Sequence, residues 1–372
     1  MLRHTIPIGR VFGIPIELDY SWFLIAALIT WILAVNYYPI ELKGGTSVEY
    51  WLMGAVTAVL FFVSILVHEL AHSWVALRYK VPVNRITLFI FGGVSQIAGE
   101  PPSAAAEFLI AVVGPLTSFV LAALFYFSEP LLVNITPALA IAKYLALING
   151  ILGLFNLIPG FPLDGGRVFR AIVWGVNKNF RRATLIAAST GRFFGFLFIF
   201  WGVWQALRGN IFNGLWIAFI GWFLESAAAA QVQQQMVQGL LGGHKVSEAM
   251  GNECTHVSGD ASVQKLIDEE VLTHGRQCFL VDRGDRVVGL LTLHHMKEIP
   301  RPSWTTTTAS QAMMPIEKLS KTDASADLGT AMEKMGREGI NEIPVMQGNS
   351  LVGMLSTGDI VKYLQTLQQV GT

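Results

Sequence analysis

The stretch that decides the fold, SILVHELAHSWVAL, runs from Ser64 to Leu77 and places ionisable side chains inside an apolar segment. His68 and His72 are four residues apart, so on a helix they share one face, with Glu69 on the adjacent face. The motif H-E-x-x-H lets two imidazoles bind one zinc ion and puts a carboxylate beside the water that zinc activates. The alternative, two core histidines beside an ion-paired glutamate, is weaker at membrane depth, because lipid supplies no polar partners.

The composition of the 372-residue chain predicts a membrane protein with a polar C-terminal part. Hydrophobic residues make up 52% and charged residues only 14%, and the mean hydropathy is +0.50, unlike a soluble domain. The net charge of +0 gives no argument for nucleic acid as a partner. Cys254 and Cys278 make no disulfide framework, and we expect them to be reduced thiols in a cytosolic setting. We expect no cleavable signal peptide, because no small-residue cleavage site follows the first apolar run.

Several apolar runs reach the length of about 20 residues that a helix needs to cross a bilayer core. They end near Glu225, so we expect a membrane part over residues 1–230. The spans are expected at Tyr20–Ile40, Trp51–Leu77, Phe108–Ser128, Tyr144–Leu163, Ala183–Leu207 and Ile211–Leu224, the last running on into Ala227–Ala230. The sequence therefore predicts a multi-pass α-helical protein with about six transmembrane helices.

Basic residues gather in the loops on one side of these spans. Arg78, Lys80 and Arg85 follow the second span, and Arg181 and Arg182 follow the fourth. The loop over residues 129–137, on the other side, has no basic residue. Because cytoplasmic loops carry the excess of lysine and arginine, both termini are predicted to be cytoplasmic in the cell membrane.

The stretch FNLIPGFPLDGGR, from Phe155 to Arg167, supplies an acid for the metal site. Asp164 ends the fourth apolar run, where two prolines interrupt the helix and two glycines let backbone approach closely. Its carboxylate is expected to reach a metal on a neighbouring helix, although a helix or turn cap would also suit this residue. Two histidines and one acid leave a fourth position for water, as in catalytic zinc sites. Asn156 is either a contact between helices or a donor to a developing oxyanion.

These residues resemble the motifs of the site-2 protease family of intramembrane zinc metalloproteases, in the prokaryotic branch with a CBS-domain pair. The resemblance rests on H-E-L-A-H at 68–72 and N-x-x-P-x-x-P-x-D-G-G at 156–166, in that order, and covers essentially the whole chain. It implies that His68, His72 and Asp164 bind zinc, with Glu69 as catalytic base. It also implies that Asn156 positions substrate or stabilises the intermediate. The implied activity is hydrolysis of peptide bonds in or near transmembrane segments of membrane-protein substrates.

Two further segments of the membrane part contain glycine. LFIFGGVSQIAGEP, from Leu88 to Pro101, alternates in polarity and is interpreted as a short hairpin or re-entrant piece, with a plain loop as the alternative. The resemblance implies that such a segment pairs with unwound substrate. Gly114 and Pro115, inside the third span, are interpreted as a kink with close helix packing rather than as chemical residues.

After Gln231 the chain becomes charged and repeats itself. VSEAM at 246–250 matches ASQAM at 309–313, and FLVDRGDRVVGLLTL at 279–293 matches IPVMQGNSLVGMLST at 343–357, with one residue inserted between the two matches. This repetition resembles a tandem CBS pair, which folds as one α/β module. We expect a linker over 231–244 and CBS domains over 245–305 and 306–372. CBS pairs often associate in twos, so a homodimer is a further expectation.

In CBS domains a hydroxyl-x-x-acid motif holds the ribose and phosphate of an adenine nucleotide. The second repeat has Ser356, Thr357 and Asp359 in this pattern, whereas the first has His295 where the acid belongs. The resemblance therefore implies at most one site for ATP, ADP or AMP. The alternative is that Asp359 caps the last helix and that the pair only dimerises.

Two other functions are alternatives to intramembrane proteolysis. A CBS-regulated channel or transporter with a structural metal would need polar or broken-helix residues along a pathway through several spans. Here the polar residues gather around one metal motif instead, and the membrane part has no evident internal repeat. A zinc protease of another membrane fold, acting on prenylated or soluble peptides, does not account for the N-x-x-P-x-x-P-x-D-G-G stretch. The sequence favours the intramembrane protease.

Overall fold

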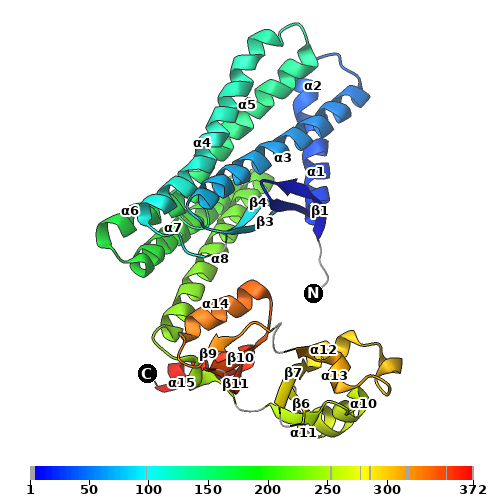
Figure 1. The fold of residues 1–372 in the computed structure, drawn as a ribbon. Coiled ribbons are helices and arrows are strands. Elements are labelled where there is room, and N and C mark those ends of the chain that lie inside the picture. The colour runs from blue at the N-terminus through cyan, green and yellow to red at the C-terminus, as the bar shows by residue number, and fades with distance from the viewer. Residues whose placement is uncertain are drawn as a thin grey trace. The chain divides into compact units, whose positions relative to one another are not determined.

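The computed structural model describes residues 5–97, 99–251, 254–276, 278–284, 286–315, 319–348 and 350–370. The chain divides into two compact units, Met1–Gln235 and Met236–Thr372. The first holds the long apolar helices and the second holds short strands and helices (Figure 1).

Within the described residues, six helical stretches are long and apolar enough to cross a membrane, as the sequence predicted. The chain is a multi-pass membrane protein. The stretches are Ser21–Glu41 (α1 Ser21–Ile32, a π-helical turn Leu33–Tyr37 and α2 Tyr38–Glu41), α3 Ser47–Arg78, Ala104–Leu131 (α4 Ala104–Ser128 and a 3-10 turn Glu129–Leu131), α5 Thr136–Asn156, α7 Phe180–Leu207 and α8 Ile211–Leu241.

The fourth span lies earlier in the chain than the predicted Tyr144–Leu163, because α5 begins at Thr136 and ends at Asn156. The prediction was wrong at both ends. The charged Lys143 lies within the helix, where its ammonium pairs with Glu41 Oε1 at 2.7 Å. In the fifth span, Arg192 pairs likewise with Glu225 at 2.9 Å, so that neither charge is left alone in the apolar layer.

A four-stranded sheet with the order β1-β2-β3-β4 accompanies these helices. Its strands are β1 Thr5–Val11, β2 Ile14–Asp19, β3 Val83–Phe89 and β4 Gly92–Ile97. The hairpin predicted around Leu88–Pro101 is confirmed as the antiparallel pair β3–β4, with β4 at the edge of the sheet. The β1–β2 hairpin was not expected. It turns through Phe12 and Gly13, which both have positive φ, as a two-residue hairpin turn requires.

The helix α4 is the central contact of the membrane unit, packing against α3, α5 and α6 (Asp164–Asn177) (Figure 1). Its buried positions include small residues such as Ala106, Ala111 and Gly114, which let neighbouring backbones approach. α6 also packs against α7. The histidine-bearing helix and the aspartate-bearing helix therefore both lie against α4.

The second unit contains two sheets of matching topology, which confirms the internal repeat. In each, one strand pairs in parallel with a second, which pairs antiparallel with a third (β5, β6 and β7; β9, β10 and β11). The strands are β5 Thr255–Ser258, β6 Cys278–Arg283, β7 Arg286–Thr292, β8 Met314–Pro315, β9 Thr322–Asp323, β10 Glu342–Gln347 and β11 Ser350–Ser356. The helices are α9 Val246–Ala249, α10 Val263–Leu266, a π turn Ile267–Val271, α11 Leu272–His274, α12 Leu293–Glu298, a 3-10 turn Arg301–Ser303, α13 Ala309–Ala312, α14 Leu328–Glu338 and α15 Thr357–Val370.

The expectation of two separate thiols was wrong, since the structure joins Cys254 and Cys278 in a disulfide. The reason lies in strand register. Thr255 of β5 pairs with Phe279 of β6, so the residues just before them face each other, and their Cα atoms are 4.8 Å apart. This distance is within the ordinary range for a disulfide.

Candidate metal centre

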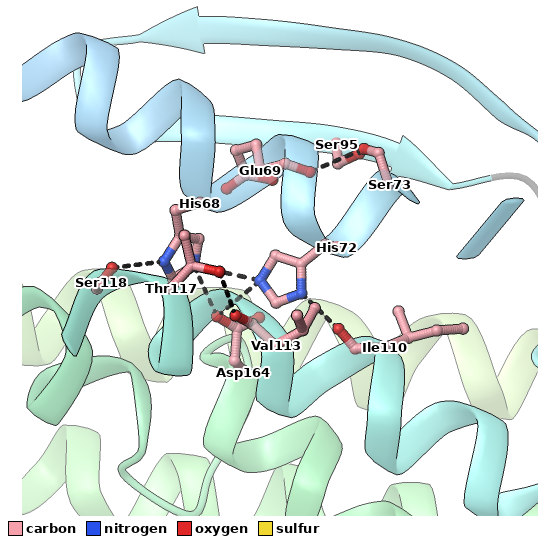
Figure 2. Close-up of polar contacts among 10 residues, drawn as sticks. All are labelled: His68, Glu69, His72, Ser73, Ser95, Ile110, Val113, Thr117, Ser118 and Asp164. Atoms are coloured by element: carbon pink, nitrogen blue, oxygen red, sulfur yellow. Dashed lines mark hydrogen bonds and ion pairs between the residues drawn. The ribbon is translucent and has the colours of Figure 1, made fainter. Parts of the chain in front are cut away.

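Three residues predicted as metal ligands come together between α3 and the start of α6. His68 Nε2 and His72 Nε2 each lie 3.1 Å from Asp164 Oδ2, and the two Nε2 atoms are 3.2 Å apart (Figure 2). Both histidines are buried, with 4% and 3% of their surface exposed. Within the described part of the chain, these three form the group of potential ligands close enough to share one metal.

The outward-facing ring nitrogens fix the orientation of both histidines. His72 Nδ1 lies 2.6 Å from the carbonyl oxygen of Ile110, and His68 Nδ1 lies 2.8 Å from Ser118 Oγ. A carbonyl oxygen only accepts, so His72 Nδ1 carries the hydrogen and its Nε2 presents a lone pair toward Asp164. Contacts of this kind to the second ring nitrogen are typical of histidines that bind metal.

The spacing of the three ligand atoms fits tetrahedral zinc. Zinc bonds of 2.0–2.1 Å in tetrahedral geometry put neighbouring ligand atoms about 3.3 Å apart. The observed separations of 3.1, 3.1 and 3.2 Å are close to this value. Two imidazoles and one carboxylate are also the donor set expected of a catalytic zinc with one open position.

Gly114 on α4 makes room for the two imidazole rings. A Cβ at this position would lie 2.1 Å from His72 Nε2 and 2.6 Å from His68 Nε2. The interpretation of Gly114 as a close-packing residue therefore holds, but it packs against the ligands themselves. Sequence reasoning missed this role. The only signal was a glycine-proline pair inside an otherwise apolar span.

Glycines also shape the backbone that carries Asp164. A Cβ on Gly165 would lie 2.4 Å from the carbonyl oxygen of Ile158, and one on Gly166 would lie 2.4 Å from Gly160. The predicted close approach of backbone is thus present. Asp164 is the first residue of α6 and Leu163 is its N-cap, so Asp164 does not have the capping role of the alternative interpretation.

The relatives of this chain agree with the metal centre. The profile of peptidase family M50 matches residues 56–135 and 132–199, and that of the CBS domain matches residues 315–366. Rip3 of Mycobacterium tuberculosis, which is named as a zinc metalloprotease, is 35% identical over 368 residues, covering 98% of this chain and 93% of its own. The chain belongs to the site-2 protease family. A zinc metalloprotease of Methanocaldococcus jannaschii is 28% identical over 370 residues, covering 99% of this chain and 98% of its own.

A solved site-2 protease from Methanocaldococcus jannaschii is also similar to part of this chain. It is 30% identical, covers 61% of this chain and 95% of its own, and superposes with a TM-score of 0.45. The match to the peptidase family M50 and the relatives named as zinc metalloproteases show that the chain is a zinc metalloprotease of family M50.

In the present chain, Glu69 lies on the side of α3 that faces β4 (Figure 2). Its side chain is half-buried, and a Cβ on Gly93 of β4 would lie 2.7 Å from Glu69 Cγ. One turn further along α3, Ser73 Oγ is 2.6 Å from Ser95 Oγ of the same strand. The edge strand is therefore held against the helix at the position of the predicted catalytic base.

In the part of the chain that the structure describes, Asn156 makes no hydrogen bond to the three ligands. Asn156 is the last residue of α5 and is half-buried. Among the described residues, none of the hydrogen bonds of the ligand group involves its side chain. Its predicted role in catalysis stays a prediction. A second asparagine of α5, Asn149, is fully buried and donates to Ser64 Oγ at 3.3 Å, a contact that the sequence did not indicate.

The predicted nucleotide contacts of the second repeat are engaged within the protein. Asp359 Oδ2 accepts hydrogen bonds from the Ser356 backbone nitrogen at 3.0 Å and from Ser356 Oγ at 2.6 Å. Thr357 Oγ1 donates to the Asn341 carbonyl oxygen at 3.2 Å. Ser356 and Asp359 therefore cap the start of α15 together, as the alternative interpretation expected of Asp359, whereas its second part, that the pair only dimerises, stays a prediction. Burial raises the pKa of the neighbouring Glu342 carboxyl, and the charge of Asp359 raises it further.

The first repeat uses the same capping arrangement without an acid. The side chain of Thr292 and that of His295 each meet the backbone nitrogen of the other residue, at 3.5 and 3.4 Å. The hydroxyl-x-x-acid pattern thus has a structural role in the strand-to-helix turn that does not depend on a ligand.

Removing the carboxylate ligand tests the metal centre directly. Asp164→Ala is expected to lower the zinc content of the purified protein, together with its activity, because two histidines alone hold zinc poorly. Zinc per chain is measured by elemental mass spectrometry on the wild type, this variant and the surface control Asp268→Ala. A zinc content unchanged from the wild type would remove Asp164 from the ligand set.

Proposed function

We propose that this site-2 protease hydrolyses peptide bonds in or near transmembrane segments of other membrane proteins. The observation that carries the proposal is the position of the two histidines of the ligand group on α3, a helix that is itself long and apolar enough to span the membrane. Reactive groups at this depth are available to a substrate that lies in the bilayer.

The residues divide the chemistry between them. Zinc, when bound by His68, His72 and Asp164, acts as a Lewis acid that polarises the scissile carbonyl and makes water more acidic. Glu69 takes the proton of the attacking water and passes it to the leaving amine. Asn156 positions the substrate or donates a hydrogen bond to the oxygen that becomes negative.

The edge strand β4 is the proposed docking place for the substrate backbone. A helical segment hides its amides in its own hydrogen bonds, so it must unwind before hydrolysis. The unwound segment can then pair with β4 at the edge of the sheet. Gly93 of this strand lies next to the Glu69 side chain. Water is expected to reach the site from the cytoplasmic side, where the distribution of basic residues predicts both termini to lie.

Metal removal separates this function from transport. The purified protein is reconstituted in liposomes with a panel of single-span membrane proteins, treated with a zinc chelator and then resupplied with zinc. Cleavage is expected to stop with the chelator and to return with zinc, because Glu69 has no activated water without the metal. Cleavage that continues after complete zinc removal contradicts the proposal, and so does a protein that binds no zinc.

The second unit is proposed to bind an adenine nucleotide beside Asp359 and to modulate cleavage. Because Asp359 caps α15, Asp359→Asn is a better test than alanine, since the amide oxygen can still accept from Ser356. Calorimetry on the full-length protein with ATP, ADP and AMP is expected to show binding that this variant weakens about 10-fold or more. Absence of binding at millimolar nucleotide, or equal binding by the variant, contradicts the nucleotide site. Regulation further requires that nucleotide changes the rate of cleavage.

A further inference from the structure

A buried ion pair joins α4 to α6 outside the ligand group. Glu107 is fully buried on α4, and Arg170 on α6 is only 8% exposed. Arg170 Nε donates to Glu107 Oε1 at 2.6 Å, and Arg170 Nη2 donates to the same oxygen. Burying two charges is costly unless they are paired, so the fold has reason to keep both residues together.

The guanidinium of Arg170 also contacts the chain on both sides of α6. Its central carbon lies 4.9 Å from the ring of Phe161, which precedes the helix, and 4.6 Å from the ring of Phe180, which follows it. Arg170 Nη1 also lies 3.4 Å from Thr184 Oγ1 on α7. One side chain thus fixes both ends of the helix that begins at Asp164.

Four residues on one face of α4 contact the metal centre or the helix that carries its third ligand. Glu107, Ile110, Gly114 and Ser118 are separated by three, four and four residues, so they share a helix face. The Ile110 carbonyl oxygen forms a hydrogen bond with His72, and Ser118 Oγ forms one with His68. Gly114 leaves space for both imidazole rings. Glu107 extends the same face to α6.

Asp164 differs from the histidines in how it is held. In the described part of the structure, the hydrogen bonds of its carboxylate go to the two histidines alone (Figure 2). No side chain outside the ligand group orients it there, so the placement of its backbone, at the start of α6, must do so.

We propose that Glu107 and Arg170 are positioning residues for the third zinc ligand. By fixing α6 on α4, the pair sets the distance of the Asp164 carboxylate from the two Nε2 atoms. The helix α4 then orients all three ligands, two through hydrogen bonds to the rings and one through this ion pair. The inference rests on the proposed zinc site and adds two residues to it.

A purely structural role makes a different prediction from a positioning role. If the pair acts through Asp164, breaking it weakens zinc binding only while Asp164 is present. If the pair merely stabilises the fold, its loss has the same effect on zinc affinity with or without Asp164. A double-mutant cycle separates these two cases.

The experiment measures zinc affinity by calorimetry on the full-length, metal-free protein in detergent. The variants are E107Q/R170Q, D164A and their combination, with the exposed Arg182→Gln as control. The neutral pair avoids leaving one buried charge unpaired. We expect E107Q/R170Q to weaken zinc binding about 10- to 100-fold in the wild-type background, and to cause no further loss in the D164A background. Wild-type affinity in E107Q/R170Q, or an equal loss in both backgrounds, overturns the proposal.

Arg170→Lys provides a second variant that keeps the buried charge but loses the fork of donors. It is measured in the same cycle and is expected to weaken zinc binding only when Asp164 is present. Cobalt(II) in place of zinc gives a visible spectrum that reports the ligand geometry. The lysine variant is expected to change this spectrum, and an unchanged spectrum with unchanged affinity overturns the proposal. If the wild type itself binds no zinc, it is the proposed function that fails.

Discussion

Replacing Glu69 by Gln is expected to abolish peptide cleavage while zinc stays bound. The substitution keeps the size of the side chain beside Gly93 but removes the group that takes the proton from water. Loss of a general base lowers the rate about 100- to 10,000-fold. The three ligands are untouched, so zinc per chain should equal that of the wild type.

The measurement is the rate of cleavage of single-span substrates in liposomes, together with the zinc content of the same preparation. Glu333→Gln, an exposed glutamate of the second unit, is the matched control and should cleave at the wild-type rate. Full activity in the Glu69→Gln protein would assign the base to another residue. Loss of zinc along with activity would mean that Glu69 holds the site together rather than acting on water.

Replacing Gly114 by Ala is expected to remove zinc binding and activity together. The added methyl group would lie within 2.1 and 2.6 Å of the two Nε2 atoms, where the metal and its ligands must meet. The rings cannot simply move away, since their Nδ1 atoms are bound to α4 itself. We expect zinc affinity to fall about 100-fold or more, at the upper end of what changes around metal ligands cost.

Gly150→Ala is the control for this substitution. Gly150 also lies inside a membrane helix, but the nearest atom to its added Cβ is 4.0 Å away. It should bind zinc as the wild type does, and calorimetry with zinc compares the two variants. Wild-type affinity in the Gly114→Ala protein would show that the rings have freedom that the structure does not indicate.

The membrane part was largely predictable because length and apolarity determine which segments can span a bilayer. The number of spans followed from the sequence, and the hairpin was one of the two alternatives that the sequence left open for the segment after the second span. The fourth span lies earlier than predicted because its helix includes the charged Lys143, and only the folded chain brings Glu41 to this residue. A charge in a sequence carries no information about a partner 102 residues away.

The ligands could be predicted because their signals are local in the sequence. The two histidines are placed on one face by helix geometry alone, and the prolines and glycines around Asp164 signal a backbone that leaves the helix. Ile110, Gly114 and Ser118 contact the histidines only because α3 packs on α4. No spacing in the sequence reports that packing, and Ile110 takes part through its backbone oxygen, which has no signature at all.

In the second unit, the repeat was visible in the sequence but its details were not. The disulfide depends on the register between β5 and β6, which a count of two cysteines does not give. The motif that ends at Asp359 has the same amino-acid sequence whether it caps a helix or binds a nucleotide. The structure adds the capping hydrogen bonds, and binding is left to calorimetry.

The central claim is that Glu69 and the zinc held by His68, His72 and Asp164 cut peptide bonds within membrane segments. The most direct test is to map, by mass spectrometry, the new termini that the wild-type and Glu69→Gln proteins generate in reconstituted single-span substrates. Termini inside or at the edge of the apolar segment are expected with the wild type and none with the variant. Identical termini from both proteins, or zinc-loaded wild type that leaves every transmembrane segment intact while cutting only soluble regions, would contradict it.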